Sequence, residues 1–264
     1  MKTICICNLK GGVGKTITTA NFAAILAAQY HKRVLLLDAD GQGNLSQFFG
    51  AEPDGHTTLE LLQTGAGYYP DFVTPTATPG LDIIPADMSL MFADVDAFAT
   101  GKANLMAIAD LRDAIEEDGA DGYDYLLIDC PPAFSAASTA ALAAADDVII
   151  PIKLDAFSAA GMVTLVQQLA NMRRINERIH IAGCLITMWM PTEAMIDAAA
   201  FLRAAGIFPI FDQKIRRSPK VDDSTYARQA LTEFSPRSAA AQDYLKFVAE
   251  YLAGEAANHG EKDV

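Results

Sequence analysis

The stretch of sequence that decides the fold is residues 6–16, which read ICNLKGGVGKT. An apolar run leads into a glycine-rich turn, and Lys15 and Thr16 then open a helical pattern. The glycines let backbone N–H groups curve around phosphate oxygens because no Cβ stands in the way, and the following helix directs its positive dipole end to the same place. The sequence therefore predicts a nucleotide-binding phosphate loop made of Lys10, Gly11, Gly12, Val13, Gly14, Lys15, Thr16 and Ile17.

Two residues of this loop have a direct chemical use. Lys15 can reach the β- and γ-phosphates, and the Thr16 hydroxyl can bind Mg²⁺. The generic pattern GxxxxGK[ST] is not matched, because its first glycine falls on Leu9; the chain has KGGxGKT instead, with a second lysine, Lys10. A glycine-rich turn without a ligand is the alternative, and the strand–loop–helix context favours phosphate binding.

Short apolar runs alternate with longer helical patterns along the chain, and this alternation is typical of parallel sheets. The fold class predicted is α/β, a mostly parallel twisted sheet with helices on both faces. The strands are expected at 3–9, 33–38, 81–85, 123–129, 147–152 and 180–187. The helices are expected at 15–30, 104–117, 138–145, 156–176, 192–205 and about 237–252.

The length and composition predict one domain over residues 1–254. The chain has 264 residues, of which 51% are apolar, so a substantial core can form and wholesale disorder is excluded. We expect residues 65–80 to be a surface-loop insertion, 209–234 to be rich in loops, and 255–264 to be a flexible polar tail.

The net charge of −13 excludes a general polyanion binder, so contact with nucleic acid needs a local basic patch. The four cysteines form no C-x-x-C pair, and an apolar strand follows the first residue. We therefore expect a reducing, cytoplasmic setting and no signal peptide. The C-terminal segment carries more acidic than basic residues, which argues against binding to an anionic membrane.

The KGGxGKT loop resembles the deviant Walker A motif of the ParA/MinD family of partition and positioning ATPases. Two further motifs carry this resemblance: DADGQGN at 38–44 is similar to the family's DxDPQGN, and LLIDCPP at 126–132 is similar to its Walker B motif. A C-terminal pattern beginning PRS at 236–238 and ending at Tyr244 is also similar. The resemblance covers about 1–252 and implies ATP and Mg²⁺ as cofactors.

The resemblance implies a role for each charged residue of the motifs. Asp40 positions the attacking water, while Asp38 lies near the metal and the phosphate loop. Asp129, at the end of an apolar strand, can hold a water of the Mg²⁺ shell, so the expected metal residues are Thr16, Asp38 and Asp129. Lys10 reaches across a homodimer interface to the partner's ATP, so the expected catalytic residues are Lys10, Lys15 and Asp40. Gly41 departs from the family, which usually has proline there.

The sequence indicates the residues that contact the adenine base and the macromolecular partners less directly than it indicates the phosphate loop. By the resemblance, adenine lies against the end of a late strand and a following loop, with Met188, Ile215 and Arg216 as contacts. Non-specific DNA binding in the ATP state is expected of a local set of basic residues, namely Arg173, Arg174, Arg178, Arg216, Arg217 and Lys220.

The resemblance also implies a function, a slow, partner-stimulated ATPase in the segregation of a plasmid, chromosome or mobile element. The partner would be a ParB-like centromere-binding protein, and a nucleoid-associated location is expected. Two other functions stay open: a positioning ATPase with protein cargo, and a metabolic P-loop ligase that phosphorylates a small substrate. Lys10 and the motif at 38–44 favour the switch over the ligase.

Overall fold

A computed structural model of the chain describes residues 1–53, 55–99, 103–119, 122–155 and 158–260. These residues form a seven-stranded sheet of order β3-β4-β2-β5-β1-β6-β7. All neighbouring pairs are parallel except β3 with β4. The strands are β1 (Lys2–Ile6), β2 (Val34–Asp38), β3 (Thr74–Pro75), β4 (Leu81–Ile84), β5 (Tyr125–Asp129), β6 (Asp147–Lys153) and β7 (His180–Thr187).

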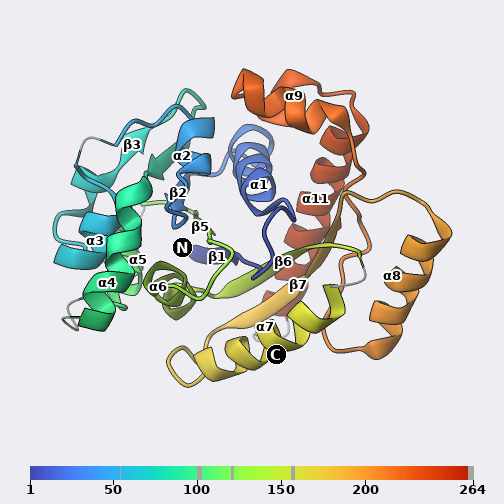
Figure 1. Ribbon diagram of the computed structural model, residues 1–264. Helices are drawn as coiled ribbons and strands as arrows, with labels where there is room; N and C mark the ends of the chain where they lie inside the picture. The colour runs from blue at the N-terminus through green and yellow to red at the C-terminus, as the bar shows by residue number, and fades with distance from the viewer. Residues whose placement is uncertain (54, 100–102, 120–121, 156–157, 261–264) are drawn as a thin grey trace.

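Helices cover both faces of this sheet, with α1 and α11 on one side and α6 and α7 on the other (Figure 1). The longer α-helices are α1 (Lys15–Tyr30), α4 (Phe92–Ala99), α5 (Ala107–Glu117), α6 (Ala136–Ala144), α7 (Ser158–Met172), α8 (Glu193–Ala205), α9 (Pro219–Ala227) and α11 (Ala239–Gly260). The shorter helical segments are α2 (Asn44–Phe48), α3 (Thr58–Thr64), η1 (Tyr69–Phe72), η2 (Met88–Met91) and α10 (Leu231–Phe234).

The central strands are buried on both faces because successive side chains point to opposite sides. On β2, Leu35 and Leu37 join the core beneath α5 and α6, while Val34 and Leu36 join the core beneath α1 and α11. The parallel strands all end at the same edge of the sheet. Asp38 and Asp129, the last residues of β2 and β5, are direct neighbours in the ladder.

The predicted fold class is confirmed, and three predicted segments need correction. The expected loop at 65–80 contains η1 and the edge strand β3, which pairs with β4 through Thr74 and Ile83. The stretch 209–234 holds α9 and α10, so it is more ordered than its polar composition indicates.

The final helix, expected to end near residue 252, continues to Gly260. The expected flexible tail at 255–264 is therefore helical over its first six positions, and residues 261–264 lie outside the described part of the chain. Helix α7 is described from Ser158, and its predicted start at residue 156 lies outside the described residues.

Candidate nucleotide-binding site

The loop between β1 and α1 presents its backbone to an open space. Gly12 and Gly14 have φ values of +68° and +87°, in the left-handed region that favours glycine. A Cβ added at Gly11 or Gly12 would meet nothing within 4 Å. Gly14 precedes α1 without a side-chain cap, so the first N–H groups of a 16-residue helix are left for another acceptor. This is the local geometry that binds an anion.

Two contacts fix the loop from inside the protein. The Thr187 hydroxyl, at the end of β7, donates to the carbonyl oxygen of Val13 at 2.8 Å. The Lys15 side chain is 7% exposed, and its ammonium donates to the carbonyl oxygen of Lys10 at 3.2 Å. Lys15 therefore spans the loop from within.

Lys10 has a different position from Lys15. Its backbone N–H donates to the Asn8 side chain at 2.9 Å, while its ammonium forms an ion pair with Asp155, just beyond β6. Gly11, Gly12, Gly14 and Lys15 line the cavity described below, whereas Lys10 is not among its lining residues. The ammonium groups of the two lysines thus have different partners, although that of Lys15 also contacts the Lys10 backbone.

Two buried carboxylates lie below the loop, on adjacent strands. Asp129 receives a hydrogen bond from the Thr19 hydroxyl at 3.4 Å, and the Thr16 hydroxyl also lowers its pKa. Burial, followed by the nearby charge of Asp38, nevertheless raises the Asp129 pKa well above its ordinary value. Its second oxygen, Oδ2, is buried with no hydrogen-bond partner among the described residues.

This unpaired oxygen is the feature that fits a divalent cation. Mg²⁺ prefers oxygen ligands and keeps several waters, so one carboxylate with a hydroxyl is a sufficient protein contribution. A group of three or more His, Cys, Asp or Glu side chains able to hold a metal is not found in the described ranges. The donors present at Thr16 and Asp129 therefore suit magnesium better than a metal that needs a full protein cage.

Asp38 is held differently from Asp129. One of its oxygens accepts from the Ser46 N–H at 2.9 Å and from the Ser46 hydroxyl at 2.7 Å, and the other accepts from the Asp40 N–H at 3.1 Å. Burial is the main cause that raises the Asp38 pKa to about 6. Both Asp38 oxygens already accept hydrogen bonds from the protein, so the geometry favours Asp129 over Asp38 as a metal ligand. The hydrogen bonds of Asp38 instead fix the segment that follows β2.

That segment, residues 40–44, forms one wall of the cavity. The Gly43 N–H closes a turn on the Asp40 carbonyl at 2.8 Å, and the Asp40 carboxylate accepts from the Gln42 N–H at 3.0 Å. Gly43 has a φ of +61°, and a Cβ there would lie 2.7 Å from the Ala86 carbonyl oxygen. The turn therefore positions Asp40 beside the phosphate loop.

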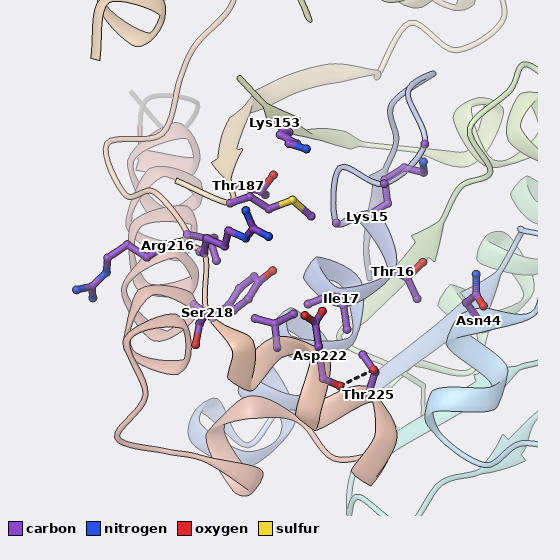
Figure 2. A pocket seen from close by; sticks show the side chains of 18 of the residues that line it. Lys15, Thr16, Ile17, Asn44, Lys153, Thr187, Arg216, Ser218, Asp222 and Thr225 are labelled. Carbon is purple, nitrogen blue, oxygen red and sulfur yellow. Dashed lines mark hydrogen bonds between the residues drawn. The ribbon is translucent and has the colours of Figure 1, made fainter. Parts of the chain in front are cut away.

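The cavity itself has a volume of about 660 Å³. Figure 2 shows Lys15, Thr16 and Ile17 on one side of it and Thr187 and Arg216 on the other. Met188, which lines it, has a φ of +50°, an uncommon value for a residue other than glycine. Apolar side chains also line the cavity, among them Met188, Ile215, Val221 and Tyr244.

The expected adenine residues Met188, Ile215 and Arg216 all line this cavity, although Arg216 is occupied elsewhere. Its guanidinium makes a two-pronged ion pair with Asp243 on α11, at 2.8 and 2.7 Å. Sequence reasoning missed the walls contributed by Lys153 of β6 and by Asp222 and Thr225 of α9. A possible signal for α9 was Ser218-Pro219, an N-cap residue followed by proline.

The residues expected to contact DNA do not form one patch. Arg173 and Arg174 follow α7, and Arg178 precedes β7, so these three lie where strands begin, at the edge opposite the cavity. Arg178 is also paired with Asp146, at 2.7 Å. Arg216 and Arg217 line the cavity. Lys220 on α9 is paired with Asp223 at 2.8 Å.

The chain is similar to several known proteins. A family model described as an AAA domain matches residues 1–181. The chromosome partitioning protein ParA of Caulobacter vibrioides is 34% identical over 259 residues, which cover 97% of this chain and 95% of that protein. Among the described residues, none of the helices is both long and apolar enough to cross a membrane.

Two solved structures share the fold. A variant of McdA from Cyanothece, in complex with ATP, superposes with a TM-score of 0.79 at 26% identity, covering 96% of both chains. Cobyrinic acid a,c-diamide synthase from Mycobacterium smegmatis, with bound ADP and magnesium, has a TM-score of 0.76 at 25% identity, covering 94% of this chain and 93% of that one. The matches in sequence, fold and phosphate loop lead to one conclusion: the chain belongs to the ParA/MinD family of P-loop ATPases with a deviant Walker A motif.

Proposed function

We propose that this protein is an ATP-dependent dimerising switch of DNA partition, which binds and hydrolyses ATP with Mg²⁺ and binds DNA non-specifically in its ATP state. The partition protein that it resembles over almost its whole length supports this function. The observation that supports a dimer is the different placement of the ammonium groups of the two loop lysines. Lys15 faces the chain's own cavity, while Lys10 lies outside the lining and is held by Asp155.

Each charged residue of the cavity has a separate role in phosphoryl transfer. The loop N–H groups and Lys15 bind and orient the phosphates. Thr16 and Asp129 would hold Mg²⁺, which neutralises charge on the phosphate oxygens when it is bound. Asp40 orients the attacking water, and Asp38 fixes the Asp40 turn through its own hydrogen bonds. Lys10 of a second copy supplies a cation from outside, a contribution worth about 10³–10⁵ in rate for arginine in comparable sites.

Dimerisation is tested by light scattering on the full chain. ATP with Mg²⁺ should convert the monomer to a dimer, and Lys10→Ala should abolish that conversion while ATP still binds. Asp155→Asn is the matched variant, since it releases Lys10 without removing it. It should dimerise at the same or a lower ATP concentration than the natural protein. Normal dimerisation by Lys10→Ala would refute a role of this lysine between subunits.

DNA binding is expected from the basic residues on the cavity side of the sheet. Arg217 is exposed there, and Lys220 and Arg216 could exchange their acidic partners for phosphates. Retention on non-specific duplex DNA should need ATP and fall steeply with salt. Arg217→Ala should weaken it, whereas Arg174→Ala, at the opposite edge, is the matched control. Equal retention with ADP would contradict a switch.

A ParB-like, centromere-binding partner and a cytoplasmic, nucleoid-associated location follow from the same proposal. A switch must persist between events, so hydrolysis should be slow alone and faster with the partner. If DNA retention proves independent of nucleotide, a positioning ATPase with protein cargo becomes the better function. The net charge of −13 and the acidic partners of Arg178, Arg216 and Lys220 favour this second candidate.

A further inference from the structure

The outer side of η2 and α4 carries a stripe of apolar side chains that face solvent. Its members are Met88, Met91, Phe92 and Val95, each more than half exposed. Because η2 and α4 follow one another directly, the spacing of three and four residues places these side chains on one side of a continuous helical segment. We call them the η2–α4 stripe.

The opposite side of the same segment is already part of the core. Leu90 and Ala93 are 5% and 1% exposed and pack in the core beneath α5 and α6. The segment is therefore apolar on two sides, whereas a surface helix normally turns polar residues to solvent. Single apolar residues are common on protein surfaces, but a contiguous exposed stripe indicates an interaction surface, and methionine is a residue that adapts to a partner.

The part of the molecule around the stripe is strongly acidic. Residues 34–111 contain 11 acidic residues and one basic residue, Lys102, which lies outside the described ranges. Residues 153–260 contain 11 acidic and 12 basic residues. Figure 1 shows α2, α3 and α4 together on one side of the molecule and α8 on the other. The negative net charge is thus concentrated on the side that carries the stripe.

Two of these acids belong to the helical segment itself. Asp87 precedes η2 and accepts from the Ser89 N–H at 2.9 Å, and Asp94 on α4 accepts from the Ala136 N–H at 2.6 Å. Both donors are neutral, and neither carboxylate forms an ion pair with another residue of the described ranges. A cationic partner would therefore meet negative charge that the protein does not itself compensate.

The stripe also touches the wall of the nucleotide cavity. The side-chain amide of Gln42 donates to the sulfur of Met88 at 3.5 Å, and Gln42 lines the cavity. A Cβ on Gly41 would lie 3.8 Å from the Met91 backbone nitrogen. A molecule bound on the stripe would thus lie beside the turn that carries Asp40.

We propose that the η2–α4 stripe is a docking surface for a basic amphipathic helix of another protein. An apolar stripe at helical spacing packs well against the apolar side of a second helix, and lysine or arginine beside that side would complement the acidic surroundings. A second copy of this chain fits less well, because in a symmetric contact the stripe meets itself and the acids face acids. An anionic membrane is repelled for the same reason.

The test is fluorescence anisotropy with the full chain and without nucleotide, so it is independent of the proposed function. The probe is a labelled model peptide of about five helical turns, with leucine on one side and lysine on the other. It should bind, and Phe92→Gln should weaken binding about 10-fold, as for a central aromatic contact. Phe201→Gln is the matched control, because Phe201 is 67% exposed on α8, outside the acidic part, and should bind the peptide normally.

Charge is tested with the same assay. A peptide with glutamate in place of lysine should bind at least about 10-fold more weakly, and added salt should weaken binding of the lysine peptide. Asp87→Asn combined with Asp94→Asn removes two charges but keeps oxygen acceptors for Ser89 and Ala136. This double variant should bind the lysine peptide about 3-fold more weakly. Equal binding of the two peptides would refute a basic partner.

Nuclear magnetic resonance of methionine methyl groups locates the bound peptide. The signals of Met88 and Met91, assigned with Met88→Leu and Met91→Leu, should shift when the lysine peptide is added. Shifts confined to Met190 and Met195 would place the peptide elsewhere and overturn the inference. Equal weakening by Phe92→Gln and Phe201→Gln would mean non-specific adhesion and would overturn it too.

Two further outcomes concern the occupant of the stripe. If the chain associates with itself without nucleotide and Phe92→Gln abolishes this, the occupant is a second copy and the assignment to another protein is wrong. No binding of the lysine peptide would overturn the inference and leave ATP binding, which is measured separately, unaffected. Met91→Gln repeats the test if thermal unfolding shows that Phe92→Gln disturbs the fold.

Discussion

Buried acidic side chains are paired differently at the two edges of the sheet. At the edge where strands begin, each acid has a partner: Asp146 binds Arg178, and Asp147 binds Lys2, His180 and Tyr251. At the edge where strands end, Asp129 keeps one buried oxygen without a partner in the described chain, and burial raises the pKa of Asp38 to about 6. Both edges are hollowed, so a cavity alone does not distinguish them.

The difference shows where the protein has kept binding capacity for something else. A buried carboxylate oxygen without a partner costs stability, and such groups persist where a ligand completes them. The paired acids at the other edge stabilise the fold, and their oxygens already have partners within the protein. The same substitution made at the two edges should therefore change activity at one edge and stability at the other.

The largest expected effect is the loss of turnover in Asp129→Asn. The neutral amide cannot replace the carboxylate at the proposed Mg²⁺ site, so ATP hydrolysis should fall about 10²–10³-fold, as when another charge-stabilising group is removed. Asp147→Asn, at the opposite edge, is the matched variant. It should unfold at a lower denaturant concentration and hydrolyse ATP at the natural rate per folded molecule. Equal losses of turnover in both variants would remove the distinction between the edges.

The pH dependence of stability should carry the signature of Asp38. Its pKa in the folded chain is about 6, against 3.8 for an ordinary aspartate, so the folded state holds the proton more tightly. This group therefore contributes stability that is complete below pH 3.8 and lost as the pH rises through 6. The contribution is about 3 kcal/mol at 1.36 kcal/mol per pKa unit.

The measurement for Asp38 is urea unfolding of the nucleotide-free chain from pH 4 to pH 7. The unfolding free energy of Asp38→Asn should lack this downward slope, whatever its absolute stability. Parallel pH profiles for the two proteins would mean that Asp38 titrates normally and that its burial does not disfavour the charge.

Two tyrosines of α11 allow a smaller comparison of the same edges. The Tyr251 hydroxyl donates to the Asp147 carboxylate at 2.7 Å, whereas the Tyr244 hydroxyl shares a hydrogen bond with Thr18 at 3.2 Å on the cavity side. Hydrogen bonds to charged groups are the stronger ones. Tyr251→Phe should lower the unfolding free energy by about 1.5–3 kcal/mol and Tyr244→Phe by about 0.5–1.5 kcal/mol. The reverse order in thermal or chemical unfolding would contradict the assignment.

The local sequence predicted β1, the glycine-rich loop and α1 well because the residues that determine them are contiguous. Apolar runs and glycine spacing place β1, the loop and α1 within fifteen residues or so of one another along the chain. The strand positions followed from the same apolar periodicity, and His180–Thr187 agrees at both ends. Helix α9 was missed because its charged, weakly apolar sequence has the composition of a loop, and its N-terminal Ser-Pro signal is local and easily overlooked.

Contacts between distant positions could not be predicted from the sequence. Asp243 forms an ion pair with Arg216, 27 positions away in the sequence, and Tyr251 donates a hydrogen bond to Asp147, 104 positions away. Which acid pairs with which base depends on how α11 lies across the sheet, and nothing in the periodicity fixes that. For the same reason the six basic residues expected to bind DNA are divided between two edges of the molecule.

The smallest expected effect concerns the turn that carries Asp40. Gly41 occupies the second position of that turn, where proline is favoured, and a Cβ there would meet its nearest atom at an ordinary 3.6 Å. Gly41→Pro should therefore raise the unfolding free energy by about 0.4–1 kcal/mol by restricting the unfolded chain. Gly43→Ala, two residues on, is the matched opposite, because its φ of +61° and the 2.7 Å approach to the Ala86 carbonyl oxygen disfavour a side chain. Urea unfolding should place the two variants on opposite sides of the natural protein. A Gly41→Pro variant less stable than the natural chain would mean that the segment after β2 needs the backbone freedom of glycine. The edge where strands end would then combine incompletely paired acidic groups with a backbone that must stay flexible.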